Sequence, residues 1–169
     1  MEHTNQPADL LADERPKALP STLNVLTILT FIGCGIYYIG GIYNFYQSSN
    51  IEKAKADMEE NMERMGDNET AAKMMEGTMD ILQKSYDNRY ILLAVTLIFT
   101  TLCLIGAMQM RKLKKSGYPV YVVGELVPHV LTIALLGFNL MTGLTTGFYL
   151  LIAIVFIILY TTQRKHLVY

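Results

Sequence analysis

The side chains whose types and spacing could do chemistry lie on one predicted helical face. They recur at three- and four-residue steps: Tyr121, Glu125, His129 and Thr132. Glu125 and His129 are four residues apart, so they share a face of a helix. A carboxylate beside an imidazole could relay a proton or hold an ion. The alternative is a structural hydrogen bond between helices, because an ionisable group among apolar residues must be paired or neutral.

No motif of a catalytic or metal site accompanies this pair. The other histidines, His3 and His166, are remote in sequence, so Glu125 and His129 supply too few ligands for a metal. A nucleophile elbow, a phosphate-binding loop and paired carboxylates are all missing from the sequence. The sequence therefore predicts no enzyme, no catalytic residue, no cofactor and no metal. A net charge of −1 without a long basic patch also argues against a nucleic-acid partner.

The helix that carries Glu125 is one of four predicted membrane spans. Hydrophobic residues make up 51% of the chain and charged residues 17%, and the charges fall in blocks between long apolar runs. A spanning helix needs about 20 mostly apolar residues. The runs that supply such helices are residues 23–45, 90–110, 119–141 and 145–160. The lipid bilayer is thus the first predicted partner.

The basic residues predict how these spans are oriented. The connection 111–115 carries four positive charges and no acid, and further bases lie at Arg15, Lys17, Arg164 and Lys165. Positive residues near span ends mark the cytoplasmic side. Both termini are therefore predicted to be cytoplasmic, with a flexible N-terminal tail (1–21) and a C-terminal tail (163–169) flanking a membrane domain (22–162).

The segment 47–89, between the first two spans, is predicted to be a helical hairpin outside the membrane. It holds ten acids and six bases, and its apolar residues recur with helical spacing on both sides of a break at Gly66-Asp67-Asn68. Six of them are methionines: Met58, Met62, Met65, Met74, Met75 and Met79. Flexible thioether surfaces suit adaptable binding of a partner, although the methionines could simply close the hairpin. The two helices could continue the first and second spans outward.

Small and polar residues form stripes on the first two spans. The first stripe consists of Asn24, Thr27, Thr30, Gly33, Tyr37, Gly40 and Asn44, and the second of Thr96, Thr100, Cys103 and Gly106. Small residues let helix backbones approach, so these stripes are expected to face each other. A water-filled path along them is the alternative. The cysteines, Cys34 and Cys103, are predicted to be packing residues without a disulfide.

Residues 106–126 resemble a pattern in small four-span inner-membrane proteins of Bacteroidota bacteria. In this chain the pattern consists of Gly106 and Met110 at a helix end, the basic turn 111–115, and Gly117-Tyr118 leading into the next helix. The resemblance covers these residues, together with the general architecture. It implies a bacterial inner membrane and indicates no particular activity.

The sequence thus predicts an all-α integral membrane four-helix bundle with an extramembrane helical hairpin between the first two spans. The favoured function is that of a non-enzymatic accessory or assembly factor whose hairpin contacts a protein partner or a second copy. The alternative is a small transporter or channel component that uses Glu125 and His129 for proton or ion handling.

Overall fold

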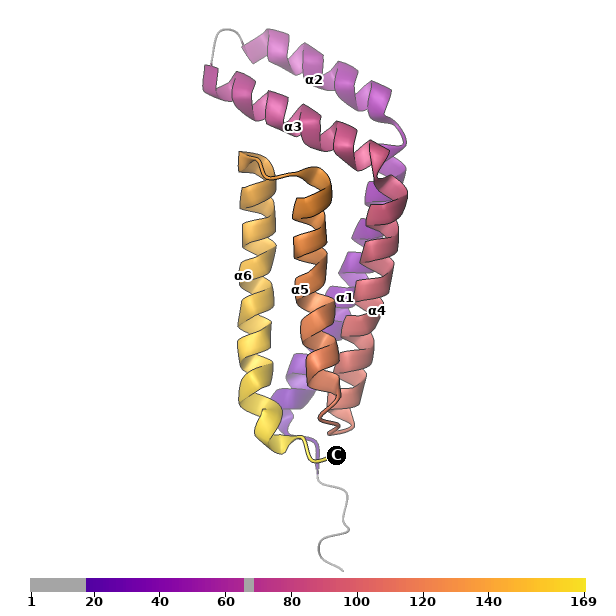
Figure 1. Cartoon of the computed structure of the whole chain (residues 1–169), viewed down its shortest axis with the longest axis vertical. Coiled ribbons are helices and arrows are strands. Elements are labelled where there is room, and N and C mark those ends of the chain that lie inside the picture. Colours follow the sequence, from indigo (N-terminus) through magenta and orange to yellow (C-terminus); the bar gives the residue numbers. More distant parts are fainter. Residues whose placement is uncertain (1–17, 66–68) are drawn as a thin grey trace, which may run out of the picture.

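The regular elements of the described chain are all helices. The structure is a computed structural model and describes residues 18–65 and 69–169, with only the backbone of Met65. In chain order the elements are α1 (Ser21–Ser48), α2 (Ile51–Met65), α3 (Glu69–Asp87), α4 (Arg89–Arg111), α5 (Gly117–Leu136), α6 (Leu140–Gln163) and the short η3 (Arg164–His166) (Figure 1). The all-α prediction is confirmed for these residues. Most of the predicted N-terminal tail, and the predicted break at 66–68, lie outside them.

Four of the helices are long and apolar enough to cross a membrane. They are α1, α4, α5 and the stretch Leu140–His166, which joins α6 to η3. In each hydrophobic window at most 22% of the residues are buried, so most of this apolar surface faces outward. A water-soluble protein rarely exposes apolar surface on this scale. The four helices therefore indicate a multi-pass membrane protein.

The turn between the third and fourth apolar helices comes earlier than predicted. α5 ends at Leu136 rather than at residue 141, and α6 begins at Leu140 rather than at about 145. Gly137 ends α5 because its φ of +80° is one that glycine adopts easily. Asn139 then caps α6, since its side chain accepts a hydrogen bond from the Thr142 N–H at 2.8 Å. The first two spans, α1 and α4, begin and end within three residues of their predicted bounds.

The tightest packing in the bundle joins α4 to α5. A Cβ added to Gly106 would lie 2.7 Å from the backbone nitrogen of Tyr121, and one added to Gly117 would lie 2.6 Å from the carbonyl oxygen of Gly106. One added to Gly124 would lie 2.8 Å from both the nitrogen and the Sγ of Cys103. Three glycines therefore let the two backbones approach each other, as small residues do between membrane helices.

α1 also packs against α4, but the two predicted polar stripes meet only in part. The Sγ of Cys34 lies 3.9 Å from the carbonyl oxygen of Thr100. Gly33 and Gly40 of the first stripe have open space where a side chain would be, and Gly106 of the second stripe faces α5 instead. The stripe on α1 is thus a contact surface along only part of its length.

The hairpin of α2 and α3 lies across one end of the bundle and does not extend α1 and α4 outward (Figure 1). The chain bends at residues 49–50 and again at Asn88, between α3 and α4. α3 then rests on the α5–α6 turn, where the side-chain amide of Asn139 donates a hydrogen bond to the carbonyl oxygen of Gly77 at 3.3 Å. We call this the hairpin end, and the opposite end, with Arg111–Lys115, the basic end.

Candidate functional site

α5 carries the four residues that the sequence singled out, about half-way along the bundle. The helix begins at Gly117, and Pro119 fits its first turn, where a backbone N–H has no partner within the helix. Tyr121 is buried, with 2% of its surface exposed. Glu125, His129 and Thr132 are half-buried. Pro128 lies inside the helix and removes one backbone donor beside His129.

The partner of Glu125 is Cys103 on the neighbouring helix. The Cys103 thiol donates a hydrogen bond to Oε2 of Glu125 at 3.3 Å, and its Sγ also lies 3.9 Å from the carbonyl oxygen of Tyr121. Gly124, one residue before Glu125, is where the backbones of α4 and α5 approach closely. The absence of a side chain at Gly124 thus lets the thiol reach the carboxylate.

The predicted Glu125–His129 pair does not form in the described structure. Among the described residues, no hydrogen bond or ion pair joins these two side chains, although they are one helical turn apart. His129 and Thr132 likewise have no hydrogen bond to each other there. The i, i+4 spacing placed the pair on one face, but the close approach of α4 gives the carboxylate a partner from another helix.

Side chains from all four helices of the bundle meet in the core beside Glu125. Cys34 on α1 and Tyr160 on α6 belong to the same buried core as Cys103 and Tyr121. The ring of Tyr160 lies 4.6 Å from that of Tyr121 between centroids, and its hydroxyl shares a 2.8 Å hydrogen bond with Thr30. We call Thr30, Cys34, Cys103, Tyr121, Glu125 and Tyr160 the Glu125 cluster.

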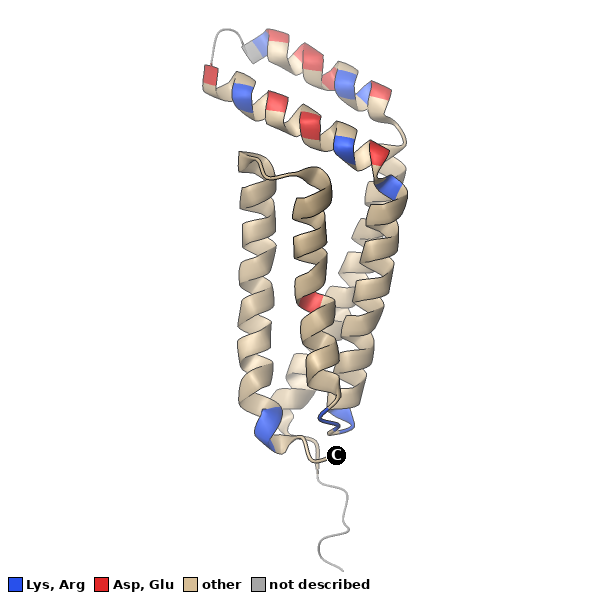
Figure 2. Ribbon diagram, viewed as in Figure 1, with Lys and Arg blue, Asp and Glu red and all other residues tan. Residues whose placement is uncertain are grey.

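The Glu125 cluster contains the one acid in the bundle helices. Figure 2 shows it as an isolated red segment within the tan bundle, far from the acids of the hairpin. Among the described residues, no group of three His, Cys, Asp or Glu side chains is placed to hold a metal ion. The chemistry available to the cluster is therefore proton exchange at the carboxylate and hydrogen bonding between helices.

The methionines predicted as a partner-binding face divide between the interior and the surface of the hairpin. Met58, Met75 and Met79 are half-buried, as residues that close a hairpin would be. Met62 and Met74 are 38% and 39% exposed. The side chain of Met65 lies outside the described residues. Three of the six methionines are thus partly covered, and two are exposed.

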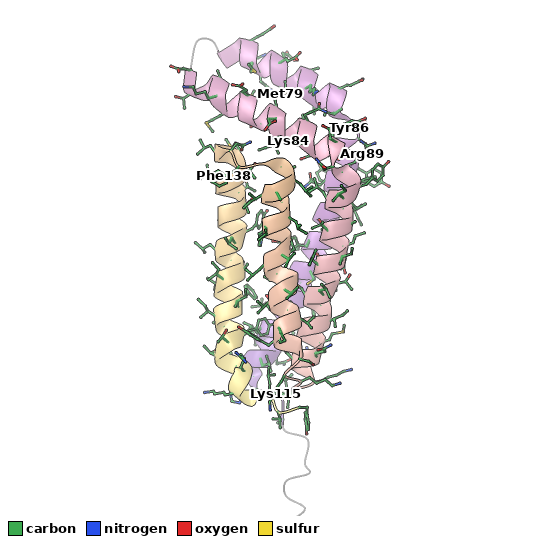
Figure 3. The ribbon with its side chains drawn as sticks, viewed as in Figure 1. Met79, Lys84, Tyr86, Arg89, Lys115 and Phe138 are labelled. Carbon is green, nitrogen blue, oxygen red and sulfur yellow. The ribbon has the colours of Figure 1, made fainter. Side chains whose placement is uncertain are left out.

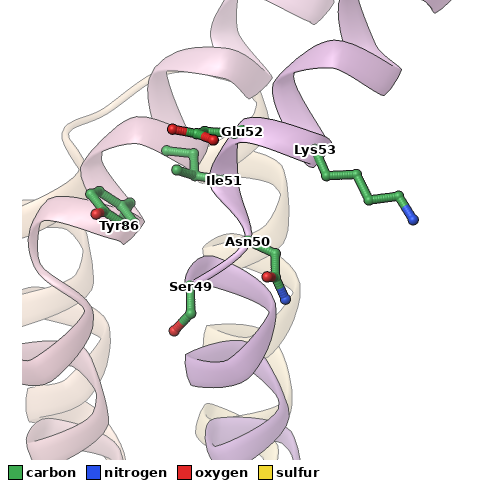
Figure 4. Close-up of a pocket in the computed structure, with 6 residues that line it drawn as sticks. All are labelled: Ser49, Asn50, Ile51, Glu52, Lys53 and Tyr86. Carbon is green, nitrogen blue, oxygen red and sulfur yellow. The ribbon is translucent and has the colours of Figure 1, made fainter.

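Two recesses lie at the hairpin end. One is at the α1–α2 bend, where Ile51 and Glu52 lie near Tyr86 and the Lys53 side chain points away (Figure 4). The other lies between α3 and the start of α6, and its lining includes Met74, Leu140 and Met141. Neither recess includes a residue of the Glu125 cluster, so neither gives access to the carboxylate.

Sequence reasoning missed two contacts that organise these sites. It assigned Cys103 to packing, although the spacing of Cys103 with Thr100 and Gly106 already placed it on a polar face. It also read residues 137–139 as part of a span, whereas Asn139 fastens the hairpin to the bundle. A glycine followed two residues later by an asparagine is a recognisable turn signal.

The arrangement as a whole defines a class of protein, a small multi-pass membrane protein with a helical hairpin at one end. No protein family model, no curated protein and no solved structure matches the chain.

Proposed function

We propose that the chain spans a bacterial inner membrane four times, with both termini cytoplasmic and the hairpin periplasmic. Two observations support this orientation. The basic end carries the exposed Arg111, Lys112, Lys114 and Lys115, and positive residues favour the cytoplasmic side. The hairpin end carries most of the acids (Figure 2). The assignment to an inner membrane rests on the resemblance of residues 106–126.

Within that membrane we propose a non-enzymatic accessory or assembly role, in which the hairpin docks a protein partner. One observation carries this proposal: α2 packs on α3 and hardly touches the helices of the bundle. Its outward side is therefore free for another protein. Met62, near the end of α2, is 38% exposed and offers an adaptable apolar contact beside this outward side.

The charge of α2 favours a partner with a basic surface. Asp57, Glu59 and Glu63 are exposed, and none of them forms an ion pair within the described residues. Glu60 is paired with Arg64 at 2.6 Å. Unpaired charges of one sign steer a partner of the opposite sign and fix its register more than they add affinity. We use the name α2 face for four exposed residues on two sides of this helix: Asp57, Glu59, Met62 and Glu63.

The α2 face can be tested with a photo-crosslinking amino acid in place of Met62, in native membranes. We expect one discrete crosslinked product. The triple variant Asp57→Asn, Glu59→Gln and Glu63→Gln should reduce its yield about tenfold, because the attraction to the basic partner is lost.

The matched control removes three exposed acids from α3: Glu69→Gln, Glu76→Gln and Asp80→Asn. It changes the net charge by the same amount and should leave the yield unchanged. Equal loss in both variants would mean that bulk charge, and not the α2 face, governs association. A product containing only two copies of this chain would identify the partner as a second copy.

A second candidate function, proton or ion handling, is favoured by the placement of Glu125. Glu125 is bonded to Cys103 on α4 and lies beside a core to which all four bundle helices contribute, which couples its protonation to helix packing. Purified protein in liposomes loaded with a pH-sensitive dye tests this. The candidate predicts proton flux above that of empty liposomes, lost in Glu125→Gln and kept in Gly40→Ala, which lies outside the Glu125 cluster. Flux no greater than in empty liposomes would exclude it.

A further inference from the structure

Two basic segments that are far apart in the sequence meet at the basic end. One is the α4–α5 connection, with Arg111, Lys112, Lys114 and Lys115, and the other is η3, with Arg164 and Lys165. All six side chains are exposed. Figure 2 shows both segments in blue at the end of the bundle opposite the hairpin. We call these six residues the basic cluster.

Backbone hydrogen bonds hold the two segments together. The N–H groups of Val168 and Tyr169 donate to the carbonyl oxygen of Leu113 at 2.9 and 3.1 Å, and the N–H of Lys115 donates to the carbonyl oxygen of Tyr169 at 2.5 Å. The side chains of Leu113 and Leu167 are both 5% exposed and belong to one apolar core. The residues that follow η3 are thus fastened onto the α4–α5 turn, which fixes the basic cluster as one surface.

Tyr118 positions one of the cations. Its hydroxyl shares a 2.8 Å hydrogen bond with Oγ1 of Thr161, which ties the start of α5 to α6. The guanidinium of Arg164 lies over the ring of Tyr118, with its Cζ 4.7 Å from the ring centroid. A guanidinium stacked on a ring keeps its N–H edge free for a bidentate contact with a phosphate.

The basic cluster has no acidic neighbour in the described chain. The carboxylate on the adjoining helix, Glu125, lies two turns into α5 and is bonded to Cys103. None of the six cations forms an ion pair within residues 18–65 and 69–169. At the hairpin end, by contrast, Lys73 and Lys84 are both paired with acids, each at 2.7 Å. Within the described residues, no Asp or Glu therefore compensates the positive charge of the basic cluster.

We propose that the basic cluster binds the phosphate headgroups of anionic phospholipids. The proposal goes beyond the docking role of the hairpin and does not depend on it. The apolar helices α4, α5 and α6 begin or end directly at the cluster, which places it at headgroup depth once these helices cross a bilayer. Lys and Arg immediately beyond a spanning helix attract anionic lipids, and Arg suits phosphate oxygens in particular.

Spin-labelled lipids test the proposal with the full chain reconstituted in phosphatidylcholine vesicles. The fraction of motionally restricted label is measured for spin-labelled phosphatidylglycerol and for spin-labelled phosphatidylcholine. We expect the anionic lipid to be preferred roughly threefold. The preference should fall towards unity in about 0.5 M NaCl, because salt screens exposed charges.

Two charge-matched variants locate the effect. The first, Lys112→Gln, Lys114→Gln, Lys115→Gln and Arg164→Gln, should abolish the preference. The second removes four cations from the hairpin instead (Lys53→Gln, Arg64→Gln, Lys73→Gln and Lys84→Gln) and should keep it. A set of Lys→Arg changes at 112, 114 and 115 retains the charge and should also keep it, which controls for misfolding.

Three results would overturn the proposal. If the wild-type chain restricts both lipids equally, the basic cluster does not select anionic lipids. Its only remaining role would then be to set the orientation of the chain in the membrane. A preference that is insensitive to salt would exclude charge as its cause. Loss of the preference in the hairpin variant alone would place lipid binding at the other end of the molecule.

Discussion

At the scale of single residues, the contact between Cys103 and Glu125 satisfies a carboxyl group inside the bundle. A carboxyl group among apolar helices is costly unless a donor is present, and removing the partner of such a group costs about 1–3 kcal/mol. Here the donor is a thiol 3.3 Å from Oε2. The contact joins α4 to α5, and it therefore stabilises the same pair of helices as the close packing at the glycines.

Replacing Cys103 tests how much this contact contributes. We expect Cys103→Ala to lower the free energy of unfolding in detergent by about 1–3 kcal/mol. Cys103→Ser keeps a donor and should lose less. In a Glu125→Leu background the alanine and serine variants should be equally stable, because no carboxylate remains to be satisfied. A constant difference between them in both backgrounds would show that the thiol acts by packing alone.

The sequence identified Glu125 but could not identify its partner. Spacing along one helix shows which residues share a face, so it predicted His129 as the partner of Glu125. The partner lies 22 residues away in the chain, and it is brought near by a close helix approach that depends on Gly124. The distance between two helices depends on how their backbones pack. The spacing of residues along one helix carries no information on that packing.

At the scale of elements, glycines decide which helices touch. The sequence correctly suggested that small residues mark helix contacts, but the two stripes that it paired meet only in part. Gly106 and Gly124 lie against backbone atoms of the adjoining helix, whereas Gly33 and Gly40 face open space. All four glycines lie in apolar runs with similar neighbours in the sequence. Only the arrangement of the helices in space shows which of them lie at a helix contact.

Alanine substitutions should distinguish the glycines at the contact of α4 and α5 from the glycines that face open space. Gly106→Ala and Gly124→Ala would each place a methyl group within about 2.8 Å of backbone atoms, so α4 and α5 must move apart. We expect each to cost roughly 1–3 kcal/mol of unfolding free energy. Gly33→Ala and Gly40→Ala should be neutral or slightly stabilising, because alanine favours the helix. Thermal unfolding of all four variants in one detergent gives the comparison.

One side chain at the α5–α6 turn joins the hairpin to the bundle by a hydrogen bond. Asn139 both caps α6 and donates to Gly77 on α3. Asn139→Ala should cost about 1 kcal/mol through the lost cap and should increase amide hydrogen exchange in α3. Asn61→Ala, on the exposed side of α2, serves as the control. Unchanged exchange in α3 after Asn139→Ala would show that the hairpin is held by other contacts.

At the scale of the whole molecule, the sequence predicted the elements better than their directions. Hydropathy found all four apolar helices, and helical spacing found the two hairpin helices. It could not show that the hairpin folds down over α5 and α6, since that depends on the bends at 49–50 and at Asn88. The meeting of residues 111–115 with η3 was equally hidden, because backbone hydrogen bonds of the last residues create it.

Figure 3 shows Met79 and Lys84 on the hairpin and Lys115 at the far end of the bundle. In the proposed arrangement α4 crosses the membrane between α3 and the α4–α5 connection, so these two ends face opposite compartments. We therefore expect opposite accessibility for a cysteine on α2 and one in the α4–α5 connection. A membrane-impermeant maleimide should label Glu60→Cys in spheroplasts. It should label Lys114→Cys only in inside-out vesicles.

The wild-type chain is its own control in this experiment, because Cys34 and Cys103 are buried between apolar helices and should stay unlabelled in both preparations. The two possible failures carry different meanings. Labelling of both introduced cysteines from one side would contradict the crossing of α4 and with it the four-span arrangement. Labelling with the sides reversed would leave the fold intact but overturn the orientation, since the basic cluster would then lie in the periplasm against the expected charge bias.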